Sequence, residues 1–230
     1  MAERADVVER GEETETTVRV LVGDDHRLFA ESLARLLGDE DGIEVIGVAA
    51  SSEEGVGAVQ RLKPDVVLVD YRMPDRDGVE TAATIKELDP SCMVVMLTGS
   101  EDDRVLLGAI DAGCSGFLTK DRAAGEVARA VRAAASGEAL ISPAQLARLL
   151  PRLSSKKTEV GTDLTRRELE LLTHLARGSS NKAIAADLHL SLNTVRNYVQ
   201  SVLTKLDAHS KLEAVATAVR EGIIDYPSAV

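Results

Sequence analysis

The chain has 230 residues, of which 44% are hydrophobic and 2% aromatic, and its formal net charge is −11 at pH 7. This hydrophobic content supports ordinary cores and argues against wholesale disorder, while the length predicts one or two domains. No apolar run approaches the about 20 residues needed to cross a bilayer, and the N-terminus lacks an apolar signal core, so we expect a cytoplasmic protein. Cys92 and Cys114 form no CxxC pair and are predicted to be reduced, buried thiols.

The charge is distributed unevenly along the chain. Residues 142–230 hold 12 Lys and Arg against 9 Asp and Glu, a balance of +3, which leaves −14 on residues 1–141. The overall charge argues against nucleic-acid binding, but halves of opposite sign predict two domains with different partners. We expect a disordered leader over 1–17, a first domain over 18–141, a linker with a short helix over 142–161, and a second domain over 162–230.

The first domain alternates between strand and helix patterns. After the first strand, Leu28, Leu33, Leu36 and Leu37 recur at helical spacing and predict the apolar face of a helix. Ser52 is expected to cap the next helix. Alternating strands and helices with short loops predict an α/β fold, a doubly wound parallel sheet covered on both faces. The predicted strands are 18–22, 44–49, 66–70, 93–97 and 116–119, and the last helix of this domain is 123–136.

The second domain shows helical patterns throughout. Thr165 and Glu168 are spaced as a capping box at the start of its first helix. A short helix over 181–188, a tight turn at 190–192 and a longer helix over 194–206 follow. This order predicts a small all-α domain with a helix-turn-helix.

Polar residues stand where the strands of the predicted sheet end. Asp24 and Asp25 follow the first strand, Asp70 ends the third, Thr98 follows the fourth and Lys120 follows the fifth. Because parallel strands end at one edge of a sheet, we expect these side chains to lie together. Clustered carboxylates need a cation, and oxygen ligands suit Mg²⁺. A hydroxyl and an ammonium beside them would hold an anion, so the set predicts phosphoryl transfer, with Asp70 as the nucleophile that forms an aspartyl-phosphate.

Each of these residues has a simpler interpretation on its own. Asp24 is consistent with a helix cap, Thr98 with a turn and Lys120 with a solvated charge. Asp70 is consistent with a loop aspartate that caps the helix starting near Asp77. Their occurrence at successive strand ends favours the site.

Residues 18–141 resemble the receiver domain of two-component response regulators, through the signature Asp-x-x-Met-Pro-x-x-Asp-Gly at 70–78. The resemblance implies a five-stranded sheet of order 2-1-3-4-5. It also implies a role for each matching residue: Asp25, Asp70 and the backbone carbonyl of Arg72 bind Mg²⁺, Asp24 assists through water, Thr98 and Lys120 hold the phosphoryl oxygens, and Phe117 is a mobile aromatic that becomes buried as the phosphoryl group draws Thr98 inward.

The C-terminal part resembles the LuxR-type helix-turn-helix of the NarL/FixJ subfamily. The matching text is Leu164–Glu168, Gly178–Ala185, Leu190–Tyr198 and Lys205-Leu206. Tyr198 departs from the pattern, because many members carry His there. The sequence preference on DNA is therefore not carried over.

The 194–206 helix is expected to lie in the major groove of DNA. Arg196, Asn197 and Gln200 share an outward face and suit base contacts, Arg to guanine and Asn or Gln to adenine. With only +3 on this module, specific binding is expected to need a homodimer on paired half-sites. Contacts to phosphates are expected from Thr194, Lys182, Lys205 and Lys211, although each lysine is equally consistent with a solvated charge.

These features predict a DNA-binding transcription regulator, not an enzyme. A histidine kinase would phosphorylate Asp70, and phosphorylation would control dimerisation and promoter binding. One alternative is a phosphorylation-independent regulator of the same fold. A Mg²⁺-dependent phosphohydrolase would need an acid two residues after Asp70, where this chain has Arg72. A ligand-sensing LuxR-type activator would need an aromatic-lined ligand domain, which the acidic half does not offer.

Overall fold

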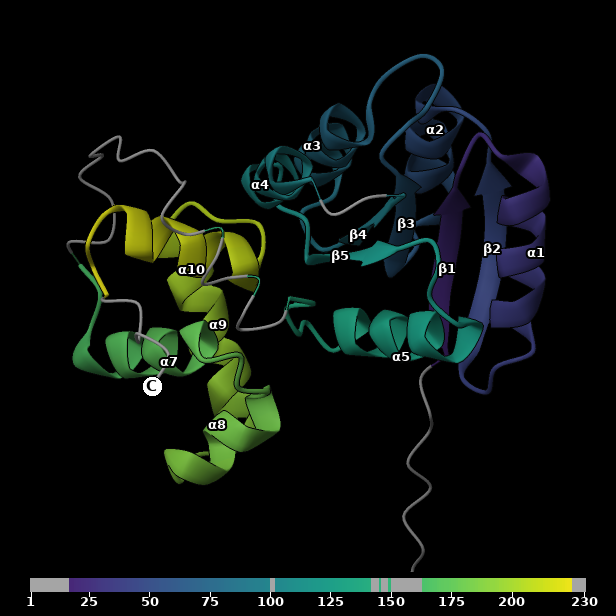
Figure 1. Cartoon of the computed structure of the whole chain (residues 1–230). Helices are drawn as coiled ribbons and strands as arrows, with labels where there is room; N and C mark the ends of the chain where they lie inside the picture. Colours follow the sequence, from purple (N-terminus) through teal and green to yellow (C-terminus); the bar gives the residue numbers. More distant parts are fainter. Residues whose placement is uncertain (1–16, 100–101, 142–144, 146–148, 150–162, 225–230) are drawn as a thin grey trace, which may run out of the picture.

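A computed structural model describes residues 17–99, 102–141, 145, 149 and 163–224. Figure 1 shows a sheet with surrounding helices, coloured purple to teal, and a group of green and yellow helices beside it. Most of the predicted leader and linker lies outside the described residues; within the linker, Gln145 and Leu149 are helical. Within the described part of the chain, no helix is both long and apolar enough to cross a bilayer.

The sheet consists of β1 (Val18–Gly23), β2 (Ile43–Ala49), β3 (Val66–Asp70), β4 (Met93–Thr98) and β5 (Gly116–Thr119). Its strands are all parallel and follow the predicted order β2-β1-β3-β4-β5. The central strand β3 is buried along its whole length, as expected for an apolar strand covered on both faces. Asp70 pairs with Leu97, and Thr98 pairs with Thr119. The strands β3, β4 and β5 therefore end at nearly the same level of the sheet.

Among the described residues, five helices cover the sheet: α1 (Arg27–Gly38), α2 (Ser52–Leu62), α3 (Gly78–Leu88), α4 (Asp103–Asp111) and α5 (Ala124–Ala135). One buried cluster contains apolar residues of α1 and α5, and another contains those of α2, α3 and α4, so the two sets cover opposite faces (Figure 1). Leu33 and Leu37 are buried as predicted. Leu28 and Leu36 were wrongly included in the apolar face: they are 81% and 50% exposed. The stripe of α1 that meets the sheet is narrower and begins at Ala30.

The N-cap of α2 differs from the prediction. Ser51 is the cap, since its hydroxyl accepts a hydrogen bond from the N–H of Glu54, whereas Ser52 is the first helical residue. Two adjacent serines offer the same capping chemistry, so the sequence pattern did not separate them. The N–H groups of Ser52 and Glu53 instead donate to the carboxylate of Asp75, at 2.9 Å each.

The C-terminal unit contains α7 (Arg166–Ala176), α8 (Asn181–Asp187), α9 (Leu192–Lys205) and α10 (Lys211–Arg220). The predicted capping box at Thr165 and Glu168 is confirmed. Helix α9 begins at Leu192, two residues before the predicted start, because the hydroxyl of Ser191 caps it by accepting from the N–H of Thr194. Buried Val195, Val199 and Val202 hold α9 in the core of this unit.

Glu168 connects the start of α7 to α9. Its carboxylate accepts hydrogen bonds from the N–H of Thr165 at 2.6 Å, the hydroxyl of Ser201 at 2.6 Å and the ammonium of Lys205 at 2.9 Å. Burial alone would raise the pKa of Glu168, but these hydrogen bonds outweigh it and lower the pKa to about 2. The carboxylate therefore stabilises the orientation of α9 as long as it is ionised.

The C-terminal unit packs against α4 and the start of β5. Arg220 of α10 pairs with Asp111 at 3.3 Å, and the hydroxyl of Ser210 donates to the carbonyl of Cys114 at 3.0 Å. The buried cluster of the α2–α4 face continues into this unit. Cys92 and Cys114 are buried free thiols, as predicted, and burial raises the pKa of both to about 12.

Gly78→Ala is expected to destabilise the chain. A Cβ at this position would lie 2.4 Å from the backbone oxygen of Asp70 and 2.8 Å from the Cα of Tyr71. Because backbone atoms must shift to accept it, we expect the free energy of unfolding to fall by about 1–3 kcal/mol in urea titrations. Gly38→Ala is the control, since a Cβ there meets nothing within 4 Å. Equal stabilities of the two variants would contradict the close packing at Gly78.

Glu168→Gln is expected to flatten the acid limb of the stability profile. The folded pKa of about 2 lies below the value of about 4.3 for an unfolded glutamate, so the contribution of Glu168 is complete above the unfolded pKa and disappears as the pH falls towards 2. The contribution is on the order of 3 kcal/mol. Denaturant titrations from pH 5 down to about 2 measure it, with Glu170→Gln as the control on the same helix. Parallel profiles for wild type and Glu168→Gln would contradict this account.

Candidate functional site

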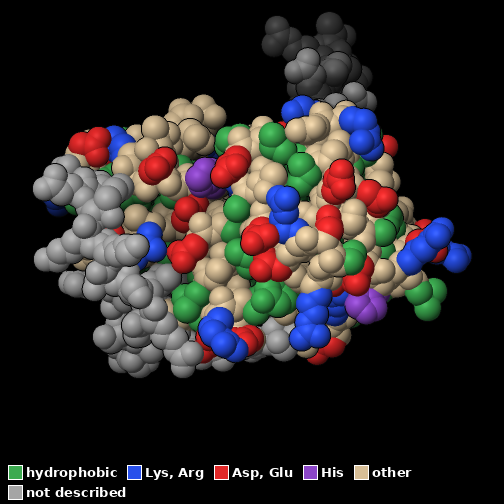
Figure 2. All heavy atoms as spheres, turned by 90° about the horizontal axis from the view of Figure 1, so that it is seen from above, with side chains coloured by type: hydrophobic (Ala, Val, Ile, Leu, Met, Phe, Trp, Pro, Cys, Tyr) green, Lys and Arg blue, Asp and Glu red, His purple; other side chains and the backbone are tan. Residues whose placement is uncertain are grey.

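The five polar residues predicted at the strand ends meet at the carboxyl edge of the sheet. Asp24 follows β1, and Asp70 and Thr98 end β3 and β4; these three residues are 0%, 3% and 2% exposed. Lys120 follows β5, and its N–H donates to the carbonyl of Thr98 at 2.9 Å. Asp25 is exposed beside Asp24. Figure 2 looks down on this side of the molecule, where acidic and basic side chains are interspersed.

Lys120 lies between the two buried carboxylates. Its Nζ is 2.7 Å from Oδ2 of Asp24 and 2.8 Å from Oδ2 of Asp70. Apart from these ion pairs, neither oxygen has a hydrogen-bond partner within the described part of the chain. The ammonium also lies 5.0 Å from the centre of the Phe29 ring, close enough for a cation–π contact. A single cation thus serves two buried carboxylates.

Burial and the shared ion pair together shift the pKa of both Asp70 and Lys120. Burial raises the pKa of Asp70, and the neighbouring charge of Asp24 adds to this effect; hydrogen bonds from Lys120 and from the N–H of Arg72 only partly oppose it. For Lys120, burial alone would lower the pKa, but its hydrogen bonds to Asp24 and Asp70 outweigh this effect and the pKa is raised. Lys120 therefore stays protonated, while the negative charge on Asp70 is costly and favours an additional cation.

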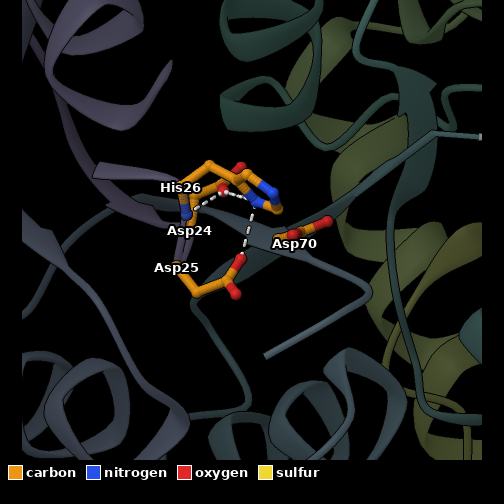
Figure 3. Close-up of side chains that lie close together, drawn as sticks. All are labelled: Asp24, Asp25, His26 and Asp70. Carbon is orange, nitrogen blue, oxygen red and sulfur yellow. Dashed lines mark hydrogen bonds and ion pairs between the residues drawn. The ribbon is translucent and has the colours of Figure 1, made fainter. Parts of the chain in front are cut away.

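The site has the composition of a divalent-cation site. Asp24, Asp25, His26 and Asp70 each offer a ligand atom, and these atoms lie within 4.8 Å of one another (Figure 3). Two buried carboxylate oxygens without a further hydrogen-bond partner fit such an ion. Carboxylate oxygens are the donors that Mg²⁺ prefers. Arg72, whose carbonyl is the predicted backbone ligand, follows Asp70 by two residues and donates its N–H to it.

Two residues near the site were not anticipated from the sequence. His26 follows the Asp24-Asp25 pair, and its Nδ1 lies 2.8 Å from Oδ1 of Asp25. Asp75, within the signature loop, holds the N-terminus of α2 through Ser52 and Glu53. For His26 the signal was its position beside the acidic pair. For Asp75 there was none, because its partners lie more than 20 residues away in sequence.

Phe117, the predicted switch aromatic, lies on β5 and is 7% exposed. It belongs to the buried cluster that continues from the α2–α4 face into the C-terminal unit. The ring is therefore already covered in this conformation. Burial on phosphorylation, as predicted from the family resemblance, would have to start from a different position of the ring.

The predicted base-contacting residues lie on the surface of α9. Arg196, Asn197 and Gln200 are all exposed. Arg196 and Gln200 nevertheless line a hollow of about 250 Å³ together with Ser136 and Gly137, which follow α5. This face of α9 is thus turned towards the first domain.

The residues predicted to contact phosphates differ in their surroundings. Lys182 is exposed on α8, and Thr194 is half-buried near the start of α9. Lys205 pairs with Glu168 at 2.9 Å. Lys211 is buried and donates to Oδ1 of Asn181 at 2.7 Å, and burial lowers its pKa to about 8. In this conformation Lys205 and Lys211 are therefore engaged within the protein, in structural contacts that lysine spacing alone did not reveal.

Comparisons with known proteins agree with both domains. Residues 20–132 match the family described as response regulator receiver domain, and residues 162–218 match the one described as bacterial regulatory proteins, luxR family. The response regulator protein VraR of Staphylococcus aureus is 36% identical over 208 residues, which cover 90% of this chain and 99% of VraR.

Two solved structures show the same likeness. The receiver domain of the putative response regulator NarL from Mycobacterium tuberculosis is 35% identical, with a TM-score of 0.51. The match covers 53% of this chain and 98% of the NarL receiver chain. A LuxR-family response regulator from Aurantimonas is 27% identical, with a TM-score of 0.55. The match covers 59% of this chain and 97% of the Aurantimonas chain. From its domain order and these relatives, the chain belongs to the NarL/FixJ-type response regulators, with a receiver domain followed by a LuxR-type DNA-binding domain.

Proposed function

We propose that phosphorylation of Asp70 controls DNA binding by the C-terminal domain of this response regulator. The observation that carries the proposal is the buried Asp70 carboxylate, which shares the Lys120 ammonium with Asp24 at the carboxyl edge of the sheet. A histidine kinase is the partner that a receiver domain implies. Double-stranded promoter DNA is the partner that a LuxR-type domain implies.

In the proposed reaction, a carboxylate oxygen of Asp70 attacks the phosphorus of a phosphodonor, and the donor's leaving group departs. Asp25, Asp70 and the backbone carbonyl of Arg72 would hold Mg²⁺, and Asp24 would assist through water. The ion would neutralise charge on the transferred group. Lys120 already contacts Asp70 and would hold one phosphoryl oxygen. Thr98, at the end of the neighbouring strand, would hold another.

The contacts between the two domains suggest how phosphorylation of Asp70 would change DNA binding. Arg196 and Gln200, the proposed base-contacting residues, face the end of α5 across the hollow. In this arrangement the receiver would obstruct a duplex that approaches Arg196 and Gln200 on α9. Phosphorylation would therefore act by shifting the chain from this closed arrangement to one in which α9 is free and two copies bind paired half-sites.

The surroundings of the lysines refine the proposed DNA contacts. Lys182 and Thr194 are kept as phosphate contacts, and Asn197 is kept with Arg196 and Gln200 as a base contact. Lys205 and Lys211 would reach DNA only after leaving Glu168 and Asn181. Their loss is expected to weaken the domain itself as well as its affinity for DNA.

Two rival functions are less well supported. A phosphorylation-independent regulator of the same fold would not need a lysine shared between two buried carboxylates. A Mg²⁺-dependent phosphohydrolase needs an acid two residues after the nucleophile, and Arg72 occupies that position. The relative VraR is described as a response regulator protein.

Asp70→Asn is expected to abolish labelling by radioactive acetyl phosphate, because the amide cannot act as the nucleophile. The matched control is Asp65→Asn, which changes an exposed aspartate at the opposite end of β3 and should label as wild type does. Measuring acid-stable label on intact protein with Mg²⁺ tests this. Labelling that persists in Asp70→Asn would place the phosphoacceptor elsewhere.

Arg196→Ala is expected to cost about 1–3 kcal/mol of binding free energy at one base position. The measurement uses a duplex selected from a random pool by wild type, together with single-base variants of that duplex. Arg129→Ala, which removes an exposed arginine from α5, is the control. An equal loss across every duplex would reassign Arg196 to a phosphate contact.

A further inference from the structure

We propose that His26 is a direct metal ligand of the acidic site and gives the site a preference for first-row transition ions, with Mn²⁺ as the test ion, over Mg²⁺. The inference rests on the proposed metal-dependent function of the receiver domain. It adds an imidazole nitrogen to a donor set that otherwise contains only oxygen.

The position of the imidazole carries the proposal. Nδ1 of His26 lies 2.8 Å from Oδ1 of Asp25 and 3.4 Å from Oδ1 of Asp24. Adjacent ligands around an octahedral ion with bonds of about 2.1 Å are about 3.0 Å apart. The two distances lie on either side of this value. In Figure 3 the ring of His26 extends over the space that the carboxylates of Asp24, Asp25 and Asp70 enclose.

Local structure holds the imidazole in this place. The backbone N–H of His26 donates to Oδ1 of Asp24 at 2.9 Å, so one buried carboxylate fixes the residue that carries the ring. His26 directly precedes α1, and its side chain is 69% exposed. One side of the ring therefore faces the site, while the other remains open to solvent.

The composition of the donor set predicts the preference. Carboxylates alone suit Mg²⁺ and Mn²⁺, whereas imidazole favours transition ions over Mg²⁺. Mn²⁺ accepts the same octahedral oxygen ligands and also binds nitrogen. Two buried oxygens, Oδ2 of Asp24 and Oδ2 of Asp70, have only the ammonium of Lys120 as a partner within the described residues. These two oxygens are available to coordinate a metal ion. The imidazole of His26 then determines which ion the site binds most tightly.

A simple histidine–carboxylate pair is the competing explanation, and the chain contains one for comparison. His174 lies 3.6 Å from Asp187 by the same atoms, Nδ1 and a carboxylate oxygen. That pair is not among the groups of described residues that offer three or more clustered ligands. His174→Gln is therefore the matched control for His26→Gln.

The test compares Mn²⁺ and Mg²⁺ affinities of the full chain by calorimetry. In His26→Gln we expect the affinity for Mn²⁺ to fall about tenfold more than the affinity for Mg²⁺, whereas His174→Gln should leave their ratio unchanged. Pulsed electron paramagnetic resonance of bound Mn²⁺ supplies a second readout. Wild type should show coupling to an imidazole nitrogen, and His26→Gln should not.

Two results would overturn the inference: an unchanged Mn²⁺ to Mg²⁺ ratio in His26→Gln, or a wild-type Mn²⁺ spectrum without nitrogen coupling. The first result includes a parallel loss of affinity for both ions in His26→Gln, which would reveal a purely structural role. Labelling of Asp70 in the wild-type chain tests the proposed function separately. If the His26 tests give a negative result and Asp70 is still labelled, the proposed function remains supported.

Discussion

The shared ion pair of Lys120 with Asp24 and Asp70 is the interaction on which the proposed chemistry of this chain depends. It exists because three parallel strands end at the same edge of one sheet and bring the residues that end or follow them into contact. Two carboxylates in a buried place repel each other, and one ammonium cannot satisfy both completely. The site therefore favours the binding of a further cation. A metal-assisted transfer of a phosphoryl group requires such a cation.

The same sheet also places the site close to the contacts that hold the second domain. Strand β5 carries Phe117 and is followed by Lys120, and the Cys114 carbonyl just before this strand accepts the hydroxyl of Ser210. Helix α4, which packs beside it, holds Arg220 of α10 through Asp111. The residues of the candidate site and the residues that contact the DNA-binding domain thus lie on or beside one short strand and one helix.

Much of this arrangement was predictable from local pattern. The meeting of Asp24, Asp70, Thr98 and Lys120 follows from alternating strands and helices, because parallel strands end at one edge of a sheet. The order of the strands was expected from the family resemblance and is confirmed. Capping residues were less certain where Ser51 and Ser52 compete. The exposure of Leu28 and the internal partners of Lys205 and Lys211 depend on tertiary packing between elements far apart in sequence. A linear pattern of residues contains no record of such packing.

The position of α9 has a consequence for the direction of control. Arg196 and Gln200 line a hollow beside the receiver. If they contact DNA as proposed, the receiver and DNA compete for one surface. Coupled equilibria of this kind are reciprocal. If phosphorylation of Asp70 favours DNA, then DNA favours the receiver conformation that accepts the phosphoryl group. A promoter is then not only the target of this regulator, because by capturing α9 it also holds the receiver in its responsive state for as long as the protein stays bound.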